Sequence, residues 1–194
     1  MTSIDLIKQL REETDVSISE CKKALEQANG DIKSAKEILR KWGKDLAGKK
    51  SERQVKQGII ESYIHTNKKV GVILKILCET DFVAKSEQFQ RLSHEICLQI
   101  VASKPLFLKE EEIPEDFLDG EAKIYQEQFK DSGKPKNIID GIVEGKLTKY
   151  KKEVSLLSQP WIKDETKTVK DLIDEYVAKI GENIVVLEFK RYEI

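Results

Sequence analysis

The sequence has few of the residue types from which disulfide frameworks, metal sites and catalytic centres are built. Its three cysteines, Cys21, Cys78 and Cys97, are odd in number and widely spaced, which argues against a disulfide framework and against a zinc knuckle. We expect them to be small buried side chains. Only two histidines, His65 and His94, occur among the 194 residues, and no catalytic cluster of recognisable spacing accompanies them. We therefore expect no enzyme activity, no cofactor and no metal site.

Long hydrophobic runs are also absent. Nowhere do 18 apolar residues follow one another, and the first residues contain an acid, Asp5, and no apolar run of signal-peptide length. The net charge is -1, and the 36% of charged residues mix both signs. Composition therefore gives no electrostatic reason to expect a nucleic-acid or membrane partner. We expect a soluble, cytoplasmic protein with no nucleic-acid and no membrane partner.

One segment begins like the zinc-protease helix HExxH. In His94-Glu-Ile-Cys-Leu98 the second histidine is replaced by Leu98, and one imidazole of the pair cannot hold the metal. A hydrolase that uses His94 remains an alternative, and it predicts metal in the purified protein.

A second segment, residues 43–50, has the GxxxxGK spacing of a phosphate-binding loop. However, Lys50 stands where a hydroxyl residue would bind magnesium, and the segment follows a helix where the motif needs a strand. Gly43 is more simply interpreted as the glycine just beyond the end of a helix.

Residues 3–43 show the hydrophobic periodicity of three short helices. The apolar positions at helical spacing are Ile4, Leu6, Ile7 and Leu10, then Ile18, Cys21, Leu25 and Ala28, then Ile32, Ala35, Ile38, Leu39 and Trp42. Residues 14–15 break the first helix, and Ser17 with Glu20 forms a capping box for the second. In Asn29-Gly30-Asp31, Gly30 suits the left-handed position that ends the second helix, and Asp31 can cap the third helix. Three helices in so short a segment predict a small bundle.

Residues 40–56 lose this periodicity and are strongly basic. Seven basic residues stand against two acidic ones, and the basic ones are Arg40, Lys41, Lys44, Lys49, Lys50, Arg53 and Lys56. We interpret the stretch as a solvated helix end or linker. A patch that binds phosphate or acidic groups is the alternative.

From residue 57 the apolar period changes to two, which is the period of a β-strand. Residues 57–65, a turn at 66–69 and residues 70–78 predict a β-hairpin. Helices are expected over 85–104, 117–130 and 136–157, and another between a cap at 168–171 and a stop at Gly181. A final strand is expected over 183–192. The predicted fold class is α+β, with a three-helix bundle followed by a small antiparallel sheet covered by helices.

The predicted helix 136–157 contains two glycines, Gly141 and Gly145, one turn apart. Each costs roughly 1 kcal/mol of helix propensity, so we expect a close approach of another backbone to explain them. The side chains expected to face inwards are Ile138, Ile142, Leu147 and Val154.

The strand 70–78 leads into Thr80-Asp-Phe-Val83, which we call the TDFV turn. Interpreted as an ordinary helix start, Thr80 or Asp81 caps the helix and Phe82 packs into the core. In the alternative, Phe82 is held out of the core for a partner to bind. The local sequence leaves both interpretations open.

Three blocks of the sequence, in this order, resemble the bacterial-type elongation factor Ts family. The first is LREETDVSISECKKAL, from Leu10 to Leu25, which continues to Asn29-Gly-Asp31. The second is CETDFVAK, from Cys78 to Lys85, the most specific motif of the family. The third comprises Gly133-Lys-Pro, Ile142-Val-Glu-Gly-Lys-Leu147, Gln159-Pro160 and Lys167-Thr-Val169. The resemblance covers nearly the whole chain.

This resemblance implies a guanine nucleotide exchange factor for the GDP-bound GTPase elongation factor Tu, acting in translation elongation. It also implies a bundle like that of ubiquitin-associated (UBA) domains over 1–45, a basic linker over 46–56 and a core domain over 57–194. The implied partner-binding residues are Thr80, Asp81, Phe82 and Val83, which help to dislodge the GTPase's magnesium ion, and Arg11, Ile18, Lys22 and Lys23 on the bundle. A short, single-core family member is further expected to form a homodimer.

An alternative from another functional class is a non-catalytic, UBA-like module that binds a protein or peptide. In that case the core domain is only a scaffold, and an exposed Ile18 beside Lys22 and Lys23 would suit the binding surface. Acceleration of GDP release from elongation factor Tu separates the two functions.

Overall fold

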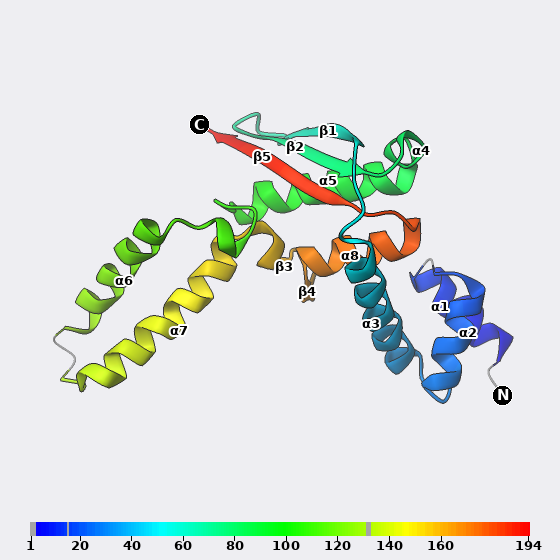
Figure 1. Ribbon diagram of the computed structural model, residues 1–194, viewed down its shortest axis with the longest axis horizontal. Helices are drawn as coiled ribbons and strands as arrows, with labels where there is room; N and C mark the ends of the chain where they lie inside the picture. Colours follow the sequence, from blue (N-terminus) through cyan, green and yellow to red (C-terminus); the bar gives the residue numbers. More distant parts are fainter. Residues whose placement is uncertain (1–2, 15, 131–132) are drawn as a thin grey trace. The chain divides into compact units, whose positions relative to one another are not determined.

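The computed structural model describes residues 3–14, 16–130 and 133–194 and confirms an α+β fold that begins with three helices (Figure 1). The helices are α1 (Ile4–Thr14), α2 (Ile18–Gln27), α3 (Ile32–Lys50), α4 (Asp81–Ala84), α5 (Glu87–Ser103), α6 (Glu115–Phe129), α7 (Lys136–Val154) and α8 (Val169–Ile180), with short 3₁₀ turns η1 (Glu110–Glu112) and η2 (Leu156–Ser158). The strands are β1 (Gln57–Ile64), β2 (Val70–Cys78), β3 (Pro160–Trp161), β4 (Asp164–Thr168) and β5 (Val185–Glu193). Within the described ranges no helix is both long and apolar enough to cross a membrane.

The chain divides into two compact units, each assembled from three separate segments. Unit 1 comprises Met1–Ile60, Lys75–Ser93 and Asp171–Leu187. Unit 2 comprises Glu61–Leu74, His94–Lys170 and Glu188–Ile194. The domain boundaries expected at residues 45 and 57 stay a prediction. They divide the chain into consecutive segments, whereas each compact unit combines segments that are far apart in the sequence.

The first three helices share a small apolar core in unit 1, and its buried side chains are Leu10, Cys21, Ala24, Leu25 and Ala35. Ser17 caps α2, because its hydroxyl accepts a hydrogen bond from the Glu20 N–H at 3.3 Å and donates one to the Glu20 carboxylate at 2.7 Å. Asp31 caps α3 by accepting from the Ser34 N–H at 2.7 Å. Gly30 has φ +85°, as the predicted left-handed stop requires. Residues 16–35 therefore fold as their local signals indicate.

Helix α3 is longer than the sequence indicated. The prediction that Gly43 ends this helix is wrong, because α3 continues to Lys50. A Cβ atom at Gly43 would lie 3.5 Å from the Cβ atom of Ala178 in α8. Gly43 is therefore a contact position between two helices, and the basic stretch is helical as far as Lys50.

Three basic residues of α3 bind α8 or the residue that follows it. Arg40 and Lys44 reach the two carboxylate oxygens of Asp171 at 2.5 and 2.6 Å. Lys50, whose side chain is 8% exposed, donates a hydrogen bond to the backbone oxygen of Gly181. These three side chains therefore have acceptors inside unit 1. Their positive charges can be explained without an external phosphate.

The main sheet has the strand order β1-β2-β5, which confirms the predicted hairpin and C-terminal strand. Burial alternates along β2, where Val70, Val72, Leu74, Ile76 and Cys78 are buried. A second, two-stranded sheet was not predicted. In it β3 and β4 are antiparallel, with Pro160 opposite Thr168 and Trp161 opposite Asp164. Strand β3 has only two residues and β4 contains no apolar side chain, so neither strand shows an apolar period of two.

Helices α6 and α7 lie side by side in unit 2 (Figure 1). The expected close approach at Gly141 and Gly145 is wrong, because a Cβ atom at either position would meet nothing within 4 Å. Ile138, expected inside, is 48% exposed, whereas Val143 and Val154 are buried. Cation–π contacts join the pair, since the Lys146 ammonium lies 4.9 Å from the Tyr125 ring centroid and 4.8 Å from that of Phe129.

The three cysteines are free thiols, and all three are buried, as predicted. Burial raises the pKa of Cys97 to about 12, with the Glu61 carboxylate adding to the effect. This thiol stays protonated at neutral pH, and protonated thiols are poor nucleophiles. The observed burial fits a packing role.

Gly58 in β1 is the glycine whose replacement we expect to cost most. It has φ +154°, and an added Cβ atom would collide with the backbone of Ile76 and Leu77. We predict that Gly58→Ala lowers the free energy of unfolding by about 2 kcal/mol or more, because both the strand pairing and φ are disturbed. Urea unfolding followed by circular dichroism measures the change.

Gly71→Ala is the matched control in β2. Its Cβ atom would lie 3.8 Å from Ile64 and from the Tyr63 carbonyl, which is ordinary contact. We expect a change within about 1 kcal/mol. Equal losses for the two variants would contradict the assignment of strain to Gly58.

Candidate functional site

The TDFV turn lies in unit 1 directly after β2 and forms the single-turn helix α4. Thr80 is its N-cap, with extended backbone angles, and the Thr80 hydroxyl accepts a hydrogen bond from the Val83 N–H at 3.3 Å. The Val83 carbonyl in turn accepts from the backbone N–H and the hydroxyl of Ser86, at 2.9 and 2.8 Å. Each end of the turn is thus fixed by a side-chain cap.

Phe82 is 82% exposed, so the interpretation that packs it into the core is wrong. Two residues further on, Ala84 is only 6% exposed. Side chains two positions apart on a helix point to nearly opposite sides, so burying Ala84 directs Phe82 to solvent. Asp81 is also exposed, while Val83 is half-buried. Thr80 therefore does cap a helix, but the aromatic residue that follows is presented outwards.

The start of the turn is held by Glu182, which follows α8 in the chain. One oxygen of the Glu182 carboxylate accepts hydrogen bonds from the backbone N–H groups of Glu79 and Thr80, at 3.1 and 3.0 Å. Its other oxygen accepts from the Thr80 hydroxyl at 2.7 Å. Three bonds to one carboxylate fix the backbone where β2 ends and α4 begins.

The neighbours of Glu182 bind two further segments of unit 1. The Asn183 backbone N–H donates to the Glu79 carboxylate at 2.6 Å. The Asn183 side chain donates to the carbonyls of Ser51 and Arg53, at 3.3 and 2.9 Å. Sequence reasoning missed residues 182 and 183 because their partners lie about 100 residues away in the chain. The one local signal was the Gly181 stop, which predicted a helix end but no contact.

Two titratable groups at the turn, Asp81 and Cys78, have shifted pKa values. A hydrogen bond from Lys85, 2.9 Å from the Asp81 carboxylate, lowers the pKa of Asp81. Burial raises the pKa of Cys78 to about 11, with Glu182 adding to the effect. The Cys78 thiol is therefore protonated and donates to the Thr80 carbonyl at 3.2 Å. The turn consequently presents one carboxylate and one aromatic ring, and no activated nucleophile.

The four residues expected to bind a partner through the bundle are all exposed: Arg11 on α1, and Ile18, Lys22 and Lys23 on α2. Ile18 is 55% exposed at the start of α2. Lys22 lies one turn further on the same side, and its ammonium is 3.8 Å from Glu26. Lys23 lies one position further round the helix. An exposed isoleucine beside two lysines suits contact with a protein surface.

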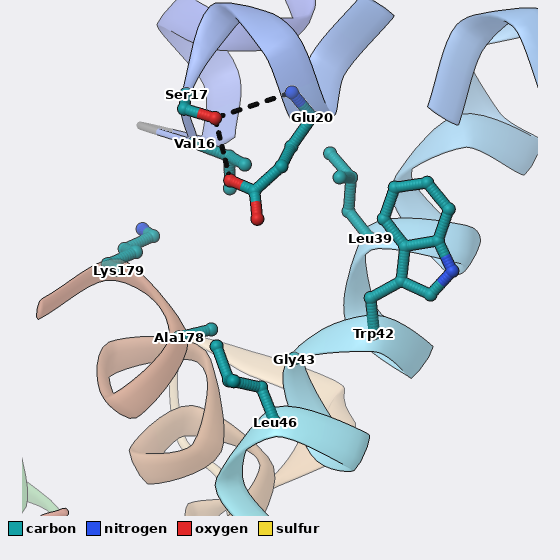
Figure 2. Close-up of a pocket in the computed structure, with 9 residues that line it drawn as sticks. All are labelled: Val16, Ser17, Glu20, Leu39, Trp42, Gly43, Leu46, Ala178 and Lys179. Carbon is teal, nitrogen blue, oxygen red and sulfur yellow. Dashed lines mark hydrogen bonds between the residues drawn. The ribbon is translucent and has the colours of Figure 1, made fainter. Parts of the chain in front are cut away.

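A small pocket lies beside the start of α2, between α2, α3 and α8 (Figure 2). Figure 2 shows the Ser17–Glu20 cap on one side and Trp42 and Leu46 on another. The cavity volume is about 110 Å³, well below the roughly 300–1,000 Å³ of typical small-molecule sites. A nucleotide would not fit in this pocket.

The arrangement around the TDFV turn supports binding to a macromolecule more than reaction chemistry. Among the residues that the structure describes, no group of three histidine, cysteine, aspartate or glutamate side chains could hold a metal ion. What the turn offers is a large apolar ring, 82% exposed, on a backbone fixed by a carboxylate and two caps. Exposed aromatic side chains on a rigid support are typical anchors of protein interfaces.

Phe82 and Phe89 form a matched pair for a stability test, because both lie in unit 1 and Phe89 is 0% exposed. We predict that Phe82→Ala changes the free energy of unfolding by about 0.5 kcal/mol or less. Phe89→Ala is expected to cost about 3–5 kcal/mol through the lost contacts and the cavity. Urea unfolding measures both, and a large loss for Phe82→Ala would contradict its exposed position.

Comparison with known proteins identifies the family. The family profile described as "Elongation factor TS" matches residues 5–194. The chain is 48% identical over 194 residues to elongation factor Ts from Thermosipho melanesiensis, covering 100% of this chain and 99% of that protein. It is 52% identical over 192 residues to elongation factor Ts from Thermotoga petrophila, covering 99% of this chain and 96% of that protein. With a profile match over nearly its whole length and relatives this similar, the chain belongs to the elongation factor Ts family.

Proposed function

We propose that this protein is the guanine nucleotide exchange factor of elongation factor Tu and promotes GDP release during translation elongation. The observation that carries the proposal is the exposed Phe82, held on a fixed turn, in a member of the elongation factor Ts family. The protein is not an enzyme in this function. It accelerates release by binding, and no bond is made or broken.

Exchange by binding follows from thermodynamic linkage. Bound GDP requires one geometry of phosphate, magnesium and protein backbone in the GTPase. A protein that binds better to a distorted form of that site weakens nucleotide binding, and GDP and magnesium must weaken the grip of the exchange factor by the same factor. The exchange factor therefore needs a rigid surface group that fits the distorted form and fits the GDP form poorly.

The TDFV turn supplies such a group. Phe82 is the apolar anchor, and Asp81 beside it carries a negative charge at neutral pH, as an exposed aspartate does. The hydrogen bond from Lys85 lowers the pKa of Asp81 further. Both press on the nucleotide-binding domain of elongation factor Tu and help to dislodge its magnesium ion. Thr80 and Val83 carry the cap and the anchoring contacts that keep the turn in place.

The bundle provides a second contact with the same GTPase domain, through Arg11, Ile18, Lys22 and Lys23. These residues are exposed, and none of them belongs to the buried core of the bundle. We assign the bundle to residues 1–45, the basic linker to 46–56, of which residues 46–50 continue helix α3, and the core domain to 57–194. In this arrangement the bundle contributes affinity and the TDFV turn contributes the distortion.

We also propose that the protein forms a homodimer. In unit 2, Ile64 on β1 and Ile73 on β2 are 71% and 49% exposed. Ile73 lies between the buried residues Val72 and Leu74 in a strand, so it points to the opposite face of the sheet. A second copy that covers this face would remove exposed isoleucines from water through a two-fold interface.

The competing function is a UBA-like module that only binds a protein or peptide through Ile18 and its lysine neighbours. It makes no use of Phe82. An assay of nucleotide release therefore distinguishes the two functions.

The exchange assay uses elongation factor Tu loaded with fluorescent GDP. We predict that the wild-type protein accelerates release and that Phe82→Ala slows the accelerated rate at least about tenfold, or about 1.4 kcal/mol. Leu106→Ala is the control, because Leu106 is also exposed, at 57%, but lies outside the turn. Release that is not accelerated by the wild-type protein would exclude the exchange function.

The dimer is tested by light scattering coupled to gel filtration. We predict that Ile73→Lys shifts the protein from a dimer to a monomer while circular dichroism stays unchanged, because burying the new ammonium at an interface is costly. Ile124→Lys on α6 is the control at another isoleucine, 53% exposed. A wild-type monomer, or a dimer that tolerates lysine at residue 73, would contradict this interface.

A further inference from the structure

The carboxylate of Glu182 makes three hydrogen bonds at the start of the TDFV turn. It accepts from two consecutive backbone N–H groups, those of Glu79 and Thr80, and from the Thr80 hydroxyl. Hydrogen bonds to an ionised acceptor are roughly twice as strong as neutral ones. Glu182 therefore fixes the backbone two residues before Phe82.

The direction of the Thr80 hydroxyl hydrogen follows from this geometry. A carboxylate is an acceptor only, so the hydroxyl must donate to Glu182 at 2.7 Å. Its lone pairs are then turned to the Val83 N–H, 3.3 Å away, which is the cap of α4. Glu182 thereby orients the Thr80 hydroxyl, which caps α4. This cap sets the direction of the helical turn that bears Phe82.

The segment that carries Glu182 is itself held from both sides. Gly181 has φ +85°, and its carbonyl accepts from the buried side chain of Lys50. Asn183 binds the carbonyls of Ser51 and Arg53 and the carboxylate of Glu79. Glu182 is thus a fixed acceptor, and the position of the turn follows from it.

We propose that Glu182 is a positioning residue for exchange, which holds Phe82 in the orientation that distorts the GTPase. The inference rests on the proposed exchange function. Removing the carboxylate leaves two backbone N–H groups and a hydroxyl without their acceptor, so the turn samples other orientations. Binding through the bundle is retained, but fewer complexes have Phe82 in the effective position.

The test measures GDP release from elongation factor Tu over a range of exchange-factor concentrations. For Glu182→Ala we expect the saturating release rate to fall roughly tenfold, since displacement of a key group by about 1 Å has effects of this size. The concentration that gives half the saturating rate is expected to change less than about threefold, because the bundle contacts are unaffected. Glu182→Gln keeps one carbonyl acceptor for the two N–H groups and is expected to restore part of the rate.

Asn183→Ala is the control for general damage to the segment. Its side chain does not bind the turn, and in this variant the Asn183 backbone N–H still binds Glu79 and Lys50 still binds Gly181, so the saturating rate is expected to fall less than for Glu182→Ala, by about threefold at most. A loss equal to that of Glu182→Ala would overturn the positioning role.

A double variant tests whether Glu182 acts through Phe82. If it does, Phe82→Ala with Glu182→Ala is no slower than Phe82→Ala alone. Losses of release rate that multiply in the double variant would overturn the inference, as would a wild-type release rate for Glu182→Ala. Failure of the exchange function itself is a different outcome, in which wild type does not accelerate release or Phe82→Ala matches wild type.

Amide hydrogen exchange of the free protein provides an independent local measurement. In Glu182→Ala we expect the Glu79 and Thr80 amides to exchange at least about tenfold faster, while the buried amides of α5 keep their wild-type rates. Unchanged exchange at both amides would show that Glu182 does not hold the turn.

Discussion

The hydrogen bonds of residues 181–183 connect three parts of unit 1 that are far apart in the sequence. They join the end of α3, the end of β2 with the TDFV turn, and the end of α8. Each of these ends leaves backbone groups without partners in its own helix or strand, and such groups are costly to leave unpaired. The exposed Phe82 depends on this arrangement, because an aromatic ring in water has no packing of its own to fix it.

The same unit explains the distribution of charge on α3. A basic stretch in a sequence suggests an external acidic partner, but Arg40 and Lys44 bind Asp171, and Lys50 binds the Gly181 carbonyl. These contacts fasten α3 to α8 beside the close approach at Gly43. The end of the bundle's third helix and the base of the TDFV turn thus meet the same short segment, so the two proposed contact surfaces share one support.

An exchange factor of this kind differs from an enzyme in what its surface must do. A catalytic group needs a shifted pKa and a pocket, whereas a distorting group needs a fixed position and exposure to the partner. The TDFV turn meets the second description. Its caps and the Glu182 carboxylate fix the backbone, Ala84 is buried below it, and Phe82 is 82% exposed. Rigidity comes from hydrogen bonds, and exposure from the alternation of side chains round one helical turn.

The sequence by itself determined the local elements and the family. Residues such as Ser17, Gly30 and Asp31 act on atoms within a few positions, so the bundle's caps and the hairpin at 57–78 could be predicted, and family motifs singled out the TDFV turn. Only the tertiary structure decided the length of α3, the exposure of Gly141 and Gly145, and the side on which Phe82 lies. The physical reason is distance along the chain, because Ala178 and Asp171 act on α3, and Glu182 on Thr80, from more than 100 residues away.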